Sequence, residues 1–312
     1  MGPYFVINVE VPLTMNSKRL LYVAGPTSSG KTSLAIALAQ HFDTEILSCD
    51  SRQFYKEMSI GTAVPSSEEL AAVPHHFIQQ RSIYEPYSVG AFQREALDCL
   101  ESLFKTKDTV ILVGGSGLYA DALIDGLDHF PEVEPAFRDQ LNNQLKQEGI
   151  EALAALLKNI DPAYHQKVDL GNPHRLIRAL EVCFSSGQPY SSFLGNKKAP
   201  TFFKTQRIVL QWDRQILYER INLRIDIMVA AGLEAEAQSL YPNKDVNALQ
   251  TVGYREWFSH FDGTLDRTTT LEEIKKNTRR YAKRQTTWFK RYQDALLVPG
   301  GSSVEDVLKK FN

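Results

Sequence analysis

The sequence predicts an α/β protein with a P-loop NTPase-like core, in which helices cover both faces of a parallel β-sheet, and a helical insertion domain. Three observations support this fold class. A complete phosphate-loop motif, Gly-Pro-Thr-Ser-Ser-Gly-Lys-Thr, occupies residues 25–32. Strand and helix patterns alternate from about residue 19 to 120, as in sheets with crossover helices. From about 128 to 200 the pattern becomes helical and polar.

The phosphate loop lies where such a loop can work, because the apolar run 20–24 precedes it and a helical pattern at 34–39 follows it. Glycines let successive backbone N–H groups point at phosphate oxygens, and the new helix adds its positive end. Lys31 supplies a cation, and the Thr32 hydroxyl suits Mg²⁺. The loop, which is typical of nucleotide-binding and ATP-binding proteins, predicts a bound di- or triphosphate. Its candidate ligands are Gly25, Pro26, Thr27, Ser28, Ser29, Gly30, Lys31 and Thr32.

The remaining elements of the core follow in order. A second strand at 45–49 ends at Asp50, and a helix near 88–105 leads to the apolar run 110–113. That run ends in Gly-Gly-Ser-Gly at 114–117. Because ligands bind at the carboxyl ends of parallel strands, we expect these segments to converge on one cleft. A strand at 207–212 and helices at 214–240 and 271–293 complete the core.

Domain limits follow from these patterns. We expect a disordered leader at 1–18, a core formed by 19–127 and 201–312, and a helical insertion at 128–200. The leader lacks the features of a signal peptide, and its apolar run is too short to span a membrane. Three scattered cysteines without a C-x-x-C pair argue against disulfides and zinc. We therefore expect a cytoplasmic protein, and a monomer because nothing indicates otherwise.

Two features near the strand ends bear on the chemistry. Asp50 is either a helix cap or a carboxylate that faces the phosphate loop as metal ligand or general base. The third strand ends in Val113-Gly114-Gly115-Ser116, without the acidic residue that kinases and ATPases place there to hold Mg²⁺. Close approach of a bulky ligand explains these glycines better than metal binding does. This favours a reaction other than ordinary phosphoryl transfer.

Arg224 lies on the apolar stripe of the expected helix 214–240, among Leu217, Ile221 and Met228. An arginine on such a face needs an anionic partner. The partner is either a nearby acid such as Asp226 or a phosphate group of a ligand.

The last helix carries a nucleic-acid signal. Its more apolar positions repeat at spacings of four and three from 274 to 292, and no acid occurs between 274 and 293. Eight cations without compensation surround this stripe in a chain of net charge −2. They form either a solvated face or, as we favour, a surface for a folded RNA. These cations are Lys275, Lys276, Arg279, Arg280, Lys283, Arg284, Lys290 and Arg291.

A second basic segment begins a helix in the insertion, with Asn172 as its expected cap. Arg175 and Arg178 share one face of this helix. Because Glu181 can pair with Arg178, this segment alone is a weak signal.

Taken together, these segments closely resemble bacterial tRNA dimethylallyltransferases, over residues 19 to about 293. The joint occurrence of the motifs in a fixed order is highly specific. The motifs are the phosphate loop, Asp50-Ser-Arg-Gln-Phe-Tyr, Ile60-Gly-Thr-Ala, Pro74-His-His, Gly114-Gly-Ser-Gly-Leu-Tyr, Arg178-Ala-Leu-Glu-Val, Val252-Gly-Tyr-Arg-Glu and Tyr281-Ala-Lys-Arg-Gln-Thr-Thr-Trp.

The resemblance implies a reaction. Dimethylallyl diphosphate would donate its five-carbon group to N6 of the adenosine just 3′ of the anticodon in tRNA, and diphosphate would leave. Asp50 would be the general base. Lys31, Thr32 through Mg²⁺, and Arg224 would neutralise charge on the leaving group.

The resemblance also implies that the anticodon loop of tRNA is the partner. The implied tRNA-contact residues are Asp50, Ser51, Arg52, Gln53, Ser116, His174, Arg175, Leu176, Ile177, Arg178, Arg280, Lys283, Arg284 and Gln285. Ser116 replaces the family's usual threonine, and Val64 replaces its usual lysine, so that a peripheral cation is lost.

Three alternatives stay open. A P-loop small-molecule kinase would need an acid on the third strand. An isopentenyltransferase acting on free adenine nucleotides would need neither the insertion nor the basic helix. A non-catalytic RNA-binding protein would not need an intact Gly-Lys-Thr together with Asp50.

Overall fold

The computed structural model describes residues 18–311, so that all but the last residue of the expected leader lies outside the described residues. The chain divides into two compact units, unit 1 (Met1–Ile124 and Pro200–Asn312) and unit 2 (Asp125–Ala199). Unit 2 thus begins three residues before the expected insertion, at the last residue of a helix. Each unit is described by itself below.

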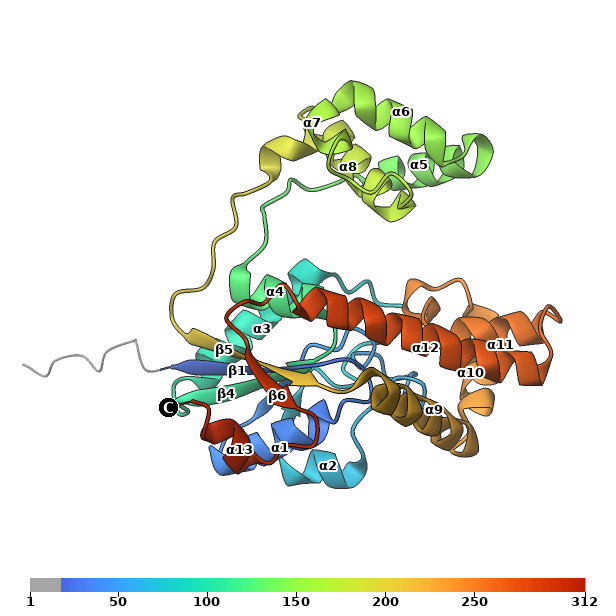
Figure 1. Cartoon of the computed structure of the whole chain (residues 1–312). Coiled ribbons are helices and arrows are strands. Elements are labelled where there is room, and N and C mark those ends of the chain that lie inside the picture. The colour runs from blue at the N-terminus through green and yellow to red at the C-terminus, as the bar shows by residue number, and fades with distance from the viewer. Residues whose placement is uncertain (1–17, 312) are drawn as a thin grey trace, which may run out of the picture. The chain divides into compact units, whose positions relative to one another are not determined.

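Unit 1 is built on a six-stranded sheet of order β3-β2-β4-β1-β5-β6, and every pairing in it is parallel (Figure 1). The phosphate-loop strand β1 lies near the centre, between β4 and β5. The strands are β1 (Arg19–Ala24), β2 (Ile46–Ser48), β3 (His75–His76), β4 (Thr109–Gly114), β5 (Lys204–Gln211) and β6 (Leu296–Pro299). The parallel α/β class predicted from the sequence is confirmed.

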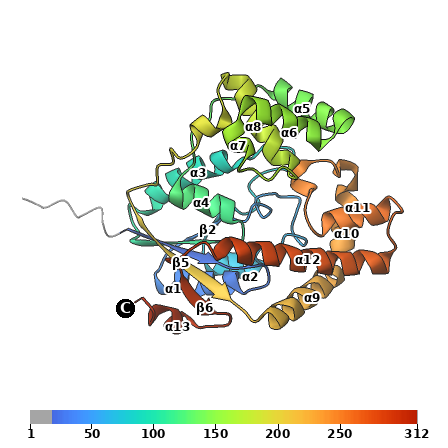
Figure 2. The same ribbon diagram turned by 45° about the horizontal axis from the view of Figure 1, so that its top comes forward.

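Helices cover both faces of this sheet. Figures 1 and 2 show α1, α2 and α13 on one face and α3 and α4 on the other. Figure 1 shows α9, α10, α11 and the long basic helix α12 toward the carboxyl ends of the strands. The helices of unit 1 are α1 (Lys31–His41), α2 (Ser67–Ala72), α3 (Val89–Leu103), α4 (Gly117–Asp125), α9 (Arg214–Ala230), α10 (Leu233–Leu240), α11 (Tyr254–Phe261), α12 (Arg267–Phe289) and α13 (Val304–Leu308).

Strand β1 explains why two cores form. Its side chains alternate, so that Leu20 and Tyr22 pack in the core beneath α3 and α4, and Leu21 and Val23 pack in the core beneath α1. Both sets are buried, as expected for a central strand of a parallel sheet. This double burial accounts for the continuous apolar run that leads into the phosphate loop.

The single helix expected at 214–240 is wrong, because Gly232 adopts a φ of +105° and separates α9 from α10. A left-handed glycine of this kind ends a helix. The basic helix also begins earlier than expected, at Arg267, where the Asp266 side chain accepts a hydrogen bond from the Thr269 N–H. It ends at Phe289, so that Tyr292 lies beyond it.

Unit 2 is a small bundle formed by α5 (Pro135–Glu148), α6 (Ile150–Ile160), α7 (Pro162–His165) and α8 (Pro173–Ser186). Its core joins Leu141, Leu153 and Leu157 to the buried face of α8. Asn172 caps α8 through the Arg175 N–H, as the sequence predicts. In the described part of the chain, no helix is both long and apolar enough to span a bilayer.

Candidate active site at the carboxyl edge of the sheet

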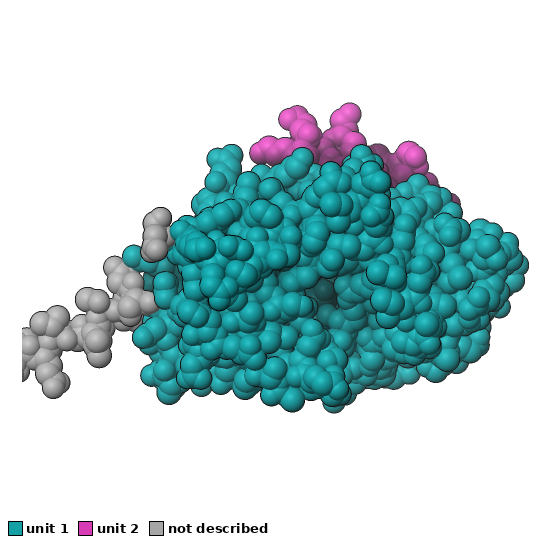
Figure 3. All heavy atoms as spheres, turned by 60° about the horizontal axis from the view of Figure 1, so that its bottom comes forward, with its two compact units in different colours: residues 1–124, 200–312 teal, residues 125–199 magenta. Residues whose placement is uncertain are grey.

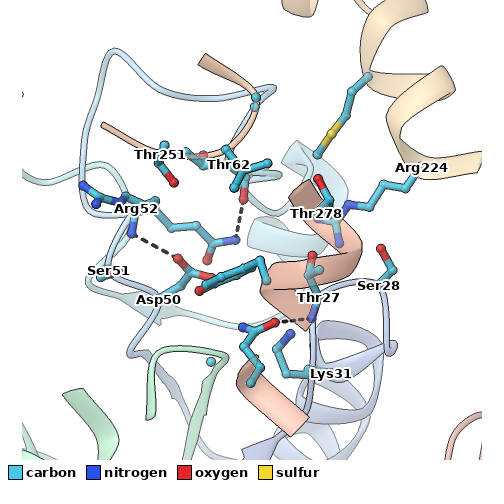
Figure 4. A pocket seen from close by; sticks show the side chains of 18 of the residues that line it. Thr27, Ser28, Lys31, Asp50, Ser51, Arg52, Thr62, Arg224, Thr251 and Thr278 are labelled. Atoms are coloured by element: carbon cyan, nitrogen blue, oxygen red, sulfur yellow. Dashed lines mark hydrogen bonds between the residues drawn. The ribbon is translucent and has the colours of Figure 1, made fainter. Parts of the chain in front are cut away.

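In unit 1 the segments that follow β1 and β2 and the end of β4 (Val113 and Gly114) line a cavity of about 420 Å³ together with α9 and α12. Lys31, Thr32, Asp50 and Arg224 all contribute to its wall. Figure 4 shows Lys31, Asp50 and Arg224 around the same space, and Figure 3 shows a hollow in the surface of unit 1. The convergence expected from the strand order is therefore present.

Side chains from outside the phosphate loop hold it in place through hydrogen bonds to its backbone carbonyl groups. Trp212 Nε1 donates to the Ser29 carbonyl at 2.9 Å, and Arg220 Nε donates to the Ser28 carbonyl at 2.9 Å. Arg220 also stacks on the Trp212 ring, 4.4 Å from its centroid. Lys31 Nζ donates to the Pro26 carbonyl at 3.0 Å. Sequence reasoning missed Arg220, although it lies one helical turn before Arg224.

Two hydroxyl groups of this loop are buried without a hydrogen-bond partner, those of Ser28 and Ser29. Ser28 also adopts a φ of +63°, which non-glycine residues rarely do. A buried hydroxyl without a partner costs free energy, and an anion in the cavity can satisfy the hydroxyl of Ser28, which lines it. The loop is thus shaped for a ligand rich in acceptors.

Lys31 and Arg224 make the cavity electropositive. Burial lowers the pKa of Lys31 to about 8, Asp50 opposes this shift and Arg224 reinforces it. Burial also lowers the pKa of Arg224, against the attraction of Asp50 and Glu69. The Asp226 carboxylate pairs with Lys275 at 2.8 Å, so that it is not the partner of Arg224. An anionic ligand would relieve both cations at once.

Asp50 begins a tight turn, in which its Oδ1 accepts a hydrogen bond from the Arg52 N–H at 3.0 Å. The turn is tied to the segment after β4, because the Ser51 N–H donates to Ser116 Oγ at 3.0 Å. Asp50 therefore begins a turn and not a helix, so that the interpretation as a helix cap is wrong, and its place in the cavity lining fits the other interpretation. Ser116 holds the turn in place.

Arg52 and Gln53 are largely engaged within the protein. Arg52 Nη1 donates to the carbonyls of Asn247 and Ala248 at 3.1 and 2.9 Å. Gln53 Nε2 donates to the Ala63 carbonyl at 2.8 Å. Both residues line the cavity, but these bonds leave only part of each side chain for an RNA base.

The opposite wall depends on Glu236, a residue that sequence reasoning missed. Its carboxylate accepts hydrogen bonds from the backbone N–H groups of Ser59, Ile60 and Gly61 at 2.8–3.0 Å. It also accepts one from the Tyr254 hydroxyl at 2.6 Å. The carboxylate thus fixes the Ile-Gly-Thr-Ala loop over the cavity. In the sequence, the only signal for this role is the pair of glutamates that follows Gly232 in the segment Gly-Leu-Glu-Ala-Glu at 232–236.

His75 adds a neutral acceptor to the lining. Its Nδ1 lies 2.7 Å from the Val73 carbonyl, which requires a proton on Nδ1, and its Nε2 is buried without a partner. Burial lowers the pKa of this imidazole, so that Nε2 carries a lone pair at neutral pH. The cavity therefore contains an acceptor beside its cations.

The glycines at the end of β4 serve packing within the protein, a role that the sequence did not indicate, and approach of a ligand to Gly114, which lines the cavity, stays a prediction. A Cβ on Gly114 would lie 2.5 Å from Cys49 Sγ and 3.0 Å from the Asp50 backbone nitrogen. A Cβ on Gly115 would lie 2.2 Å from Gln285 Nε2. These glycines let the neighbouring segments approach one another.

The basic helix α12 is only partly uncompensated, which corrects the count of eight free cations. Lys275 pairs with Asp226, Lys276 with Glu273 and Arg291 with Asp121. Arg279 donates to the Asn222 side chain. Among the residues that the structure describes, four exposed cations on this helix and at its end have no carboxylate partner; they are Arg280, Lys283, Arg284 and Lys290.

Gln285 does not belong with these cations. Its side chain is 6% exposed, and its amide bonds to the phosphate loop and to the segment after β4. Gln285 also lines the cavity, but both groups of its amide are engaged within the protein, and its contact with tRNA stays a prediction.

In unit 2 the predicted segment splits into buried and exposed residues. Leu176 and Ile177 are buried in the core, so that they support the helix and offer RNA no side chain. Arg178 pairs with buried Glu181 at 2.7 Å, which is the structural role weighed from the sequence. His174 and Arg175 are exposed.

This fold and cavity define a class of protein, a phosphate-loop protein in which two cations and a carboxylate line one cavity at the carboxyl edge of a parallel sheet. The model of the IPP transferase family matches residues 53–292. The chain belongs to this family.

Curated relatives agree with the assignment. The tRNA dimethylallyltransferase of Flavobacterium johnsoniae is 56% identical over 283 residues, covering 89% of this chain and 92% of that protein. The one from Christiangramia forsetii is 54% identical, covering 88% of this chain and 91% of that protein.

Solved structures agree as well. The tRNA isopentenylpyrophosphate transferase of Bacillus halodurans is 32% identical with a TM-score of 0.68, covering 95% of this chain and 94% of that chain. A eukaryotic dimethylallyltransferase acting on tRNA is 25% identical with a TM-score of 0.77, covering 93% of this chain and 75% of that chain.

Proposed function

We propose that this protein transfers a dimethylallyl group from dimethylallyl diphosphate to N6 of the adenosine 3′ of the anticodon in tRNA. The observation that carries the proposal is the placement of Lys31, Arg224 and Asp50 around one cavity. The two cations suit a diphosphate, and the carboxylate suits an acceptor that must lose a proton. The named activities of the relatives support the same reaction.

The roles of the residues follow from charge. As the bond between the prenyl carbon and the bridging oxygen breaks, negative charge grows on the leaving diphosphate. Lys31 and Arg224 stabilise that charge best in a site that excludes water. Asp50 accepts the proton from N6 as the new carbon–nitrogen bond forms. The wall formed by Ile225, Met228 and Leu233 offers an apolar surface for the prenyl group.

The site fits Mg²⁺ only in the manner typical of phosphate loops. Among the described residues no group of three His, Cys, Asp or Glu side chains could hold a metal ion. The Thr32 hydroxyl lines the cavity and would be the one protein ligand, with oxygens of the substrate and water completing the shell. When bound, Mg²⁺ would neutralise charge on the diphosphate.

We propose that tRNA is recognised by the exposed cations of α12 and by His174 and Arg175 of unit 2. The target base must leave its stack to reach a carboxylate inside a cavity. A monomeric, cytoplasmic enzyme remains our expectation.

A transfer assay with Mg²⁺ and labelled dimethylallyl diphosphate tests the proposal, with unmodified tRNA, AMP and ATP offered in parallel. Prenylated adenosine from tRNA alone is the expected result. Product from AMP or ATP would identify an enzyme of free nucleotides, and release of phosphate from ATP without prenyl transfer would support the kinase alternative.

A further inference from the structure

Gln285 is the residue through which the basic helix reaches the phosphate loop. Its Oε1 accepts a hydrogen bond from the Thr27 N–H at 2.9 Å, and its Nε2 donates to the Gly115 carbonyl at 2.9 Å. Figure 4 draws a dashed line at the backbone nitrogen of Thr27 for the first of these bonds, and both residues line the cavity. One buried amide therefore joins α12 to two of the segments that form the site.

The surroundings of this amide specify it closely. Its two groups are one acceptor and one donor, and each meets the complementary backbone group. Only glycine at position 115 leaves room for the Gln285 side chain, because a Cβ there would lie 2.2 Å from Gln285 Nε2. A carboxylate in place of the amide would keep the bond to Thr27 and set an acceptor against the Gly115 carbonyl.

The bond matters for anion binding because it uses one of the N–H groups of the phosphate loop. Pro26 has no N–H, and the Thr27 N–H is taken by Gln285. The Ser29 N–H donates to the Pro26 carbonyl at 3.2 Å. The first part of the loop is thus shaped by bonds within the protein, with Thr27 held in the lining of the cavity.

We propose that Gln285 is a positioning residue for diphosphate binding, which fixes the phosphate loop from the basic helix, and that it is not a tRNA contact. The proposal concerns the site of the proposed function and rests on it for the identity of the diphosphate. Loss of the amide would free Thr27, leave the Gly115 carbonyl without its donor and loosen the loop around the anion.

The test uses the full-length protein and measures binding of inorganic diphosphate with Mg²⁺ by calorimetry, apart from any transfer. Gln285→Met keeps the length of the side chain and removes both hydrogen bonds. We expect a loss of diphosphate affinity of about tenfold, the size expected for leaving a buried group unpaired. The affinity for tRNA should stay within about twofold of the wild type, since the side chain is buried.

Gln93→Met is the matched control. Gln93 Nε2 donates to the Ala122 carbonyl at 2.9 Å between α3 and α4, away from the cavity lining. The same loss of an amide there should leave diphosphate affinity unchanged. An equal loss in both variants would show a general effect on folding and overturn the proposal.

A double-mutant cycle gives a readout that a merely structural role would not move. Gly115→Ala pushes on Gln285 Nε2 and should weaken diphosphate binding through that side chain. Adding it to Gln285→Met should therefore cost much less than the sum of the two losses. Additive losses would contradict the proposal. If Gln285→Met does not fold, Gln285→Glu serves in its place, with an expected loss at least as large.

The outcomes separate this proposal from the proposed function. Unchanged diphosphate affinity with weakened tRNA binding would make Gln285 an RNA contact and overturn the inference. A wild-type protein that binds diphosphate but transfers no prenyl group would overturn the proposed function, and the role of Gln285 in diphosphate binding would stand.

Discussion

Arg224 on α9 adds to the effect of burial in lowering the pKa of Lys31 in the phosphate loop, although the two residues lie far apart in the sequence. Both side chains line one cavity, and burial weakens the charged form of each. Asp50 is the carboxylate that acts on both in the opposite direction. The cavity therefore holds these two cations beside one carboxylate, with Arg52, Arg255 and Arg284 also in its lining, and a bound diphosphate would supply further negative charge.

Binding of diphosphate should depend on pH through Lys31. With a pKa of about 8 in the free protein, Lys31 is mainly charged below that pH and mainly neutral above it. An anion favours the charged form, so that affinity should be highest below pH 8 and fall as the pH rises through 8. Proton uptake on binding, measured by calorimetry in buffers of different ionisation enthalpy, checks this. In Lys31→Met the step near pH 8 should vanish, and its persistence there would assign it to another group.

Arg224→Ala should lower kcat by about 100-fold, the size typical of a lost electrostatic contact to a leaving group. The change should also raise the pKa of Lys31, because it removes a neighbouring positive charge. The pH step of diphosphate binding should then move above 8. Arg224→Lys should recover only part of the rate, since lysine lacks the planar fork of arginine. A full recovery would show that charge alone is needed.

Asp50→Asn tests the general base. We expect kcat to fall between about 100-fold and 10,000-fold, the range for loss of a general base. The Asn side chain retains an acceptor for the Arg52 N–H, so that the turn should survive and tRNA affinity should be nearly intact. Single-turnover transfer together with filter binding of tRNA checks both parts. Near-normal turnover would remove Asp50 from the role of base.

The central part of the fold could be predicted from the sequence because its signals are local. β1 is an unbroken apolar run before a glycine-rich loop, and α1 follows with a regular helical pattern. The break between α9 and α10 was missed, because Gly232 inside a helical pattern either interrupts it or is tolerated. Tertiary contacts decide between the two.

In the candidate site, too, the sequence predicts the residues with a local signal and misses those that only the fold brings together. Phosphate loops have a fixed local sequence, so that Lys31 and Thr32 could be assigned from the motif alone. Gln285 lies 258 residues from its partner Thr27, and only the fold brings them together. The number of unpaired cations along the basic segment could not be predicted for the same reason. Asp226 and Asp121, which lie on other helices, form ion pairs with two of these cations.

Gly114→Ala should impair catalysis by displacing the turn that carries Asp50. Its Cβ would lie 2.9 Å from the Cys49 carbonyl carbon and 3.0 Å from the Asp50 backbone nitrogen, and backbone atoms cannot move aside without the turn. We expect kcat to fall by at least about tenfold, as a misplacement of catalytic groups implies. Gly90→Ala in α3 is the control, because its Cβ meets nothing closer than 3.7 Å and it should keep wild-type turnover. Equal kcat in the two variants would contradict the packing role of Gly114.

Charge reversal on α12 tests the tRNA surface. Arg280 and Arg284 are exposed and have no carboxylate partner in the described part of the chain. Arg280→Glu/Arg284→Glu should therefore weaken tRNA binding. The slope of log affinity against log salt should become shallower by about one to two units, because fewer counterions are released on binding when phosphate contacts are lost. Lys105→Glu/Lys309→Glu changes the net charge equally at exposed positions away from this helix.

The comparison between the two double variants separates a local contact from the field of the whole protein. A general effect of net charge would lower tRNA affinity similarly in both, because the field depends on total charge. A local contact surface would leave the Lys105→Glu/Lys309→Glu protein close to the wild-type slope. Equal slopes for the wild type and the Arg280→Glu/Arg284→Glu protein would instead return these arginines to a solvated helix face, and recognition of tRNA would have to rest on other residues.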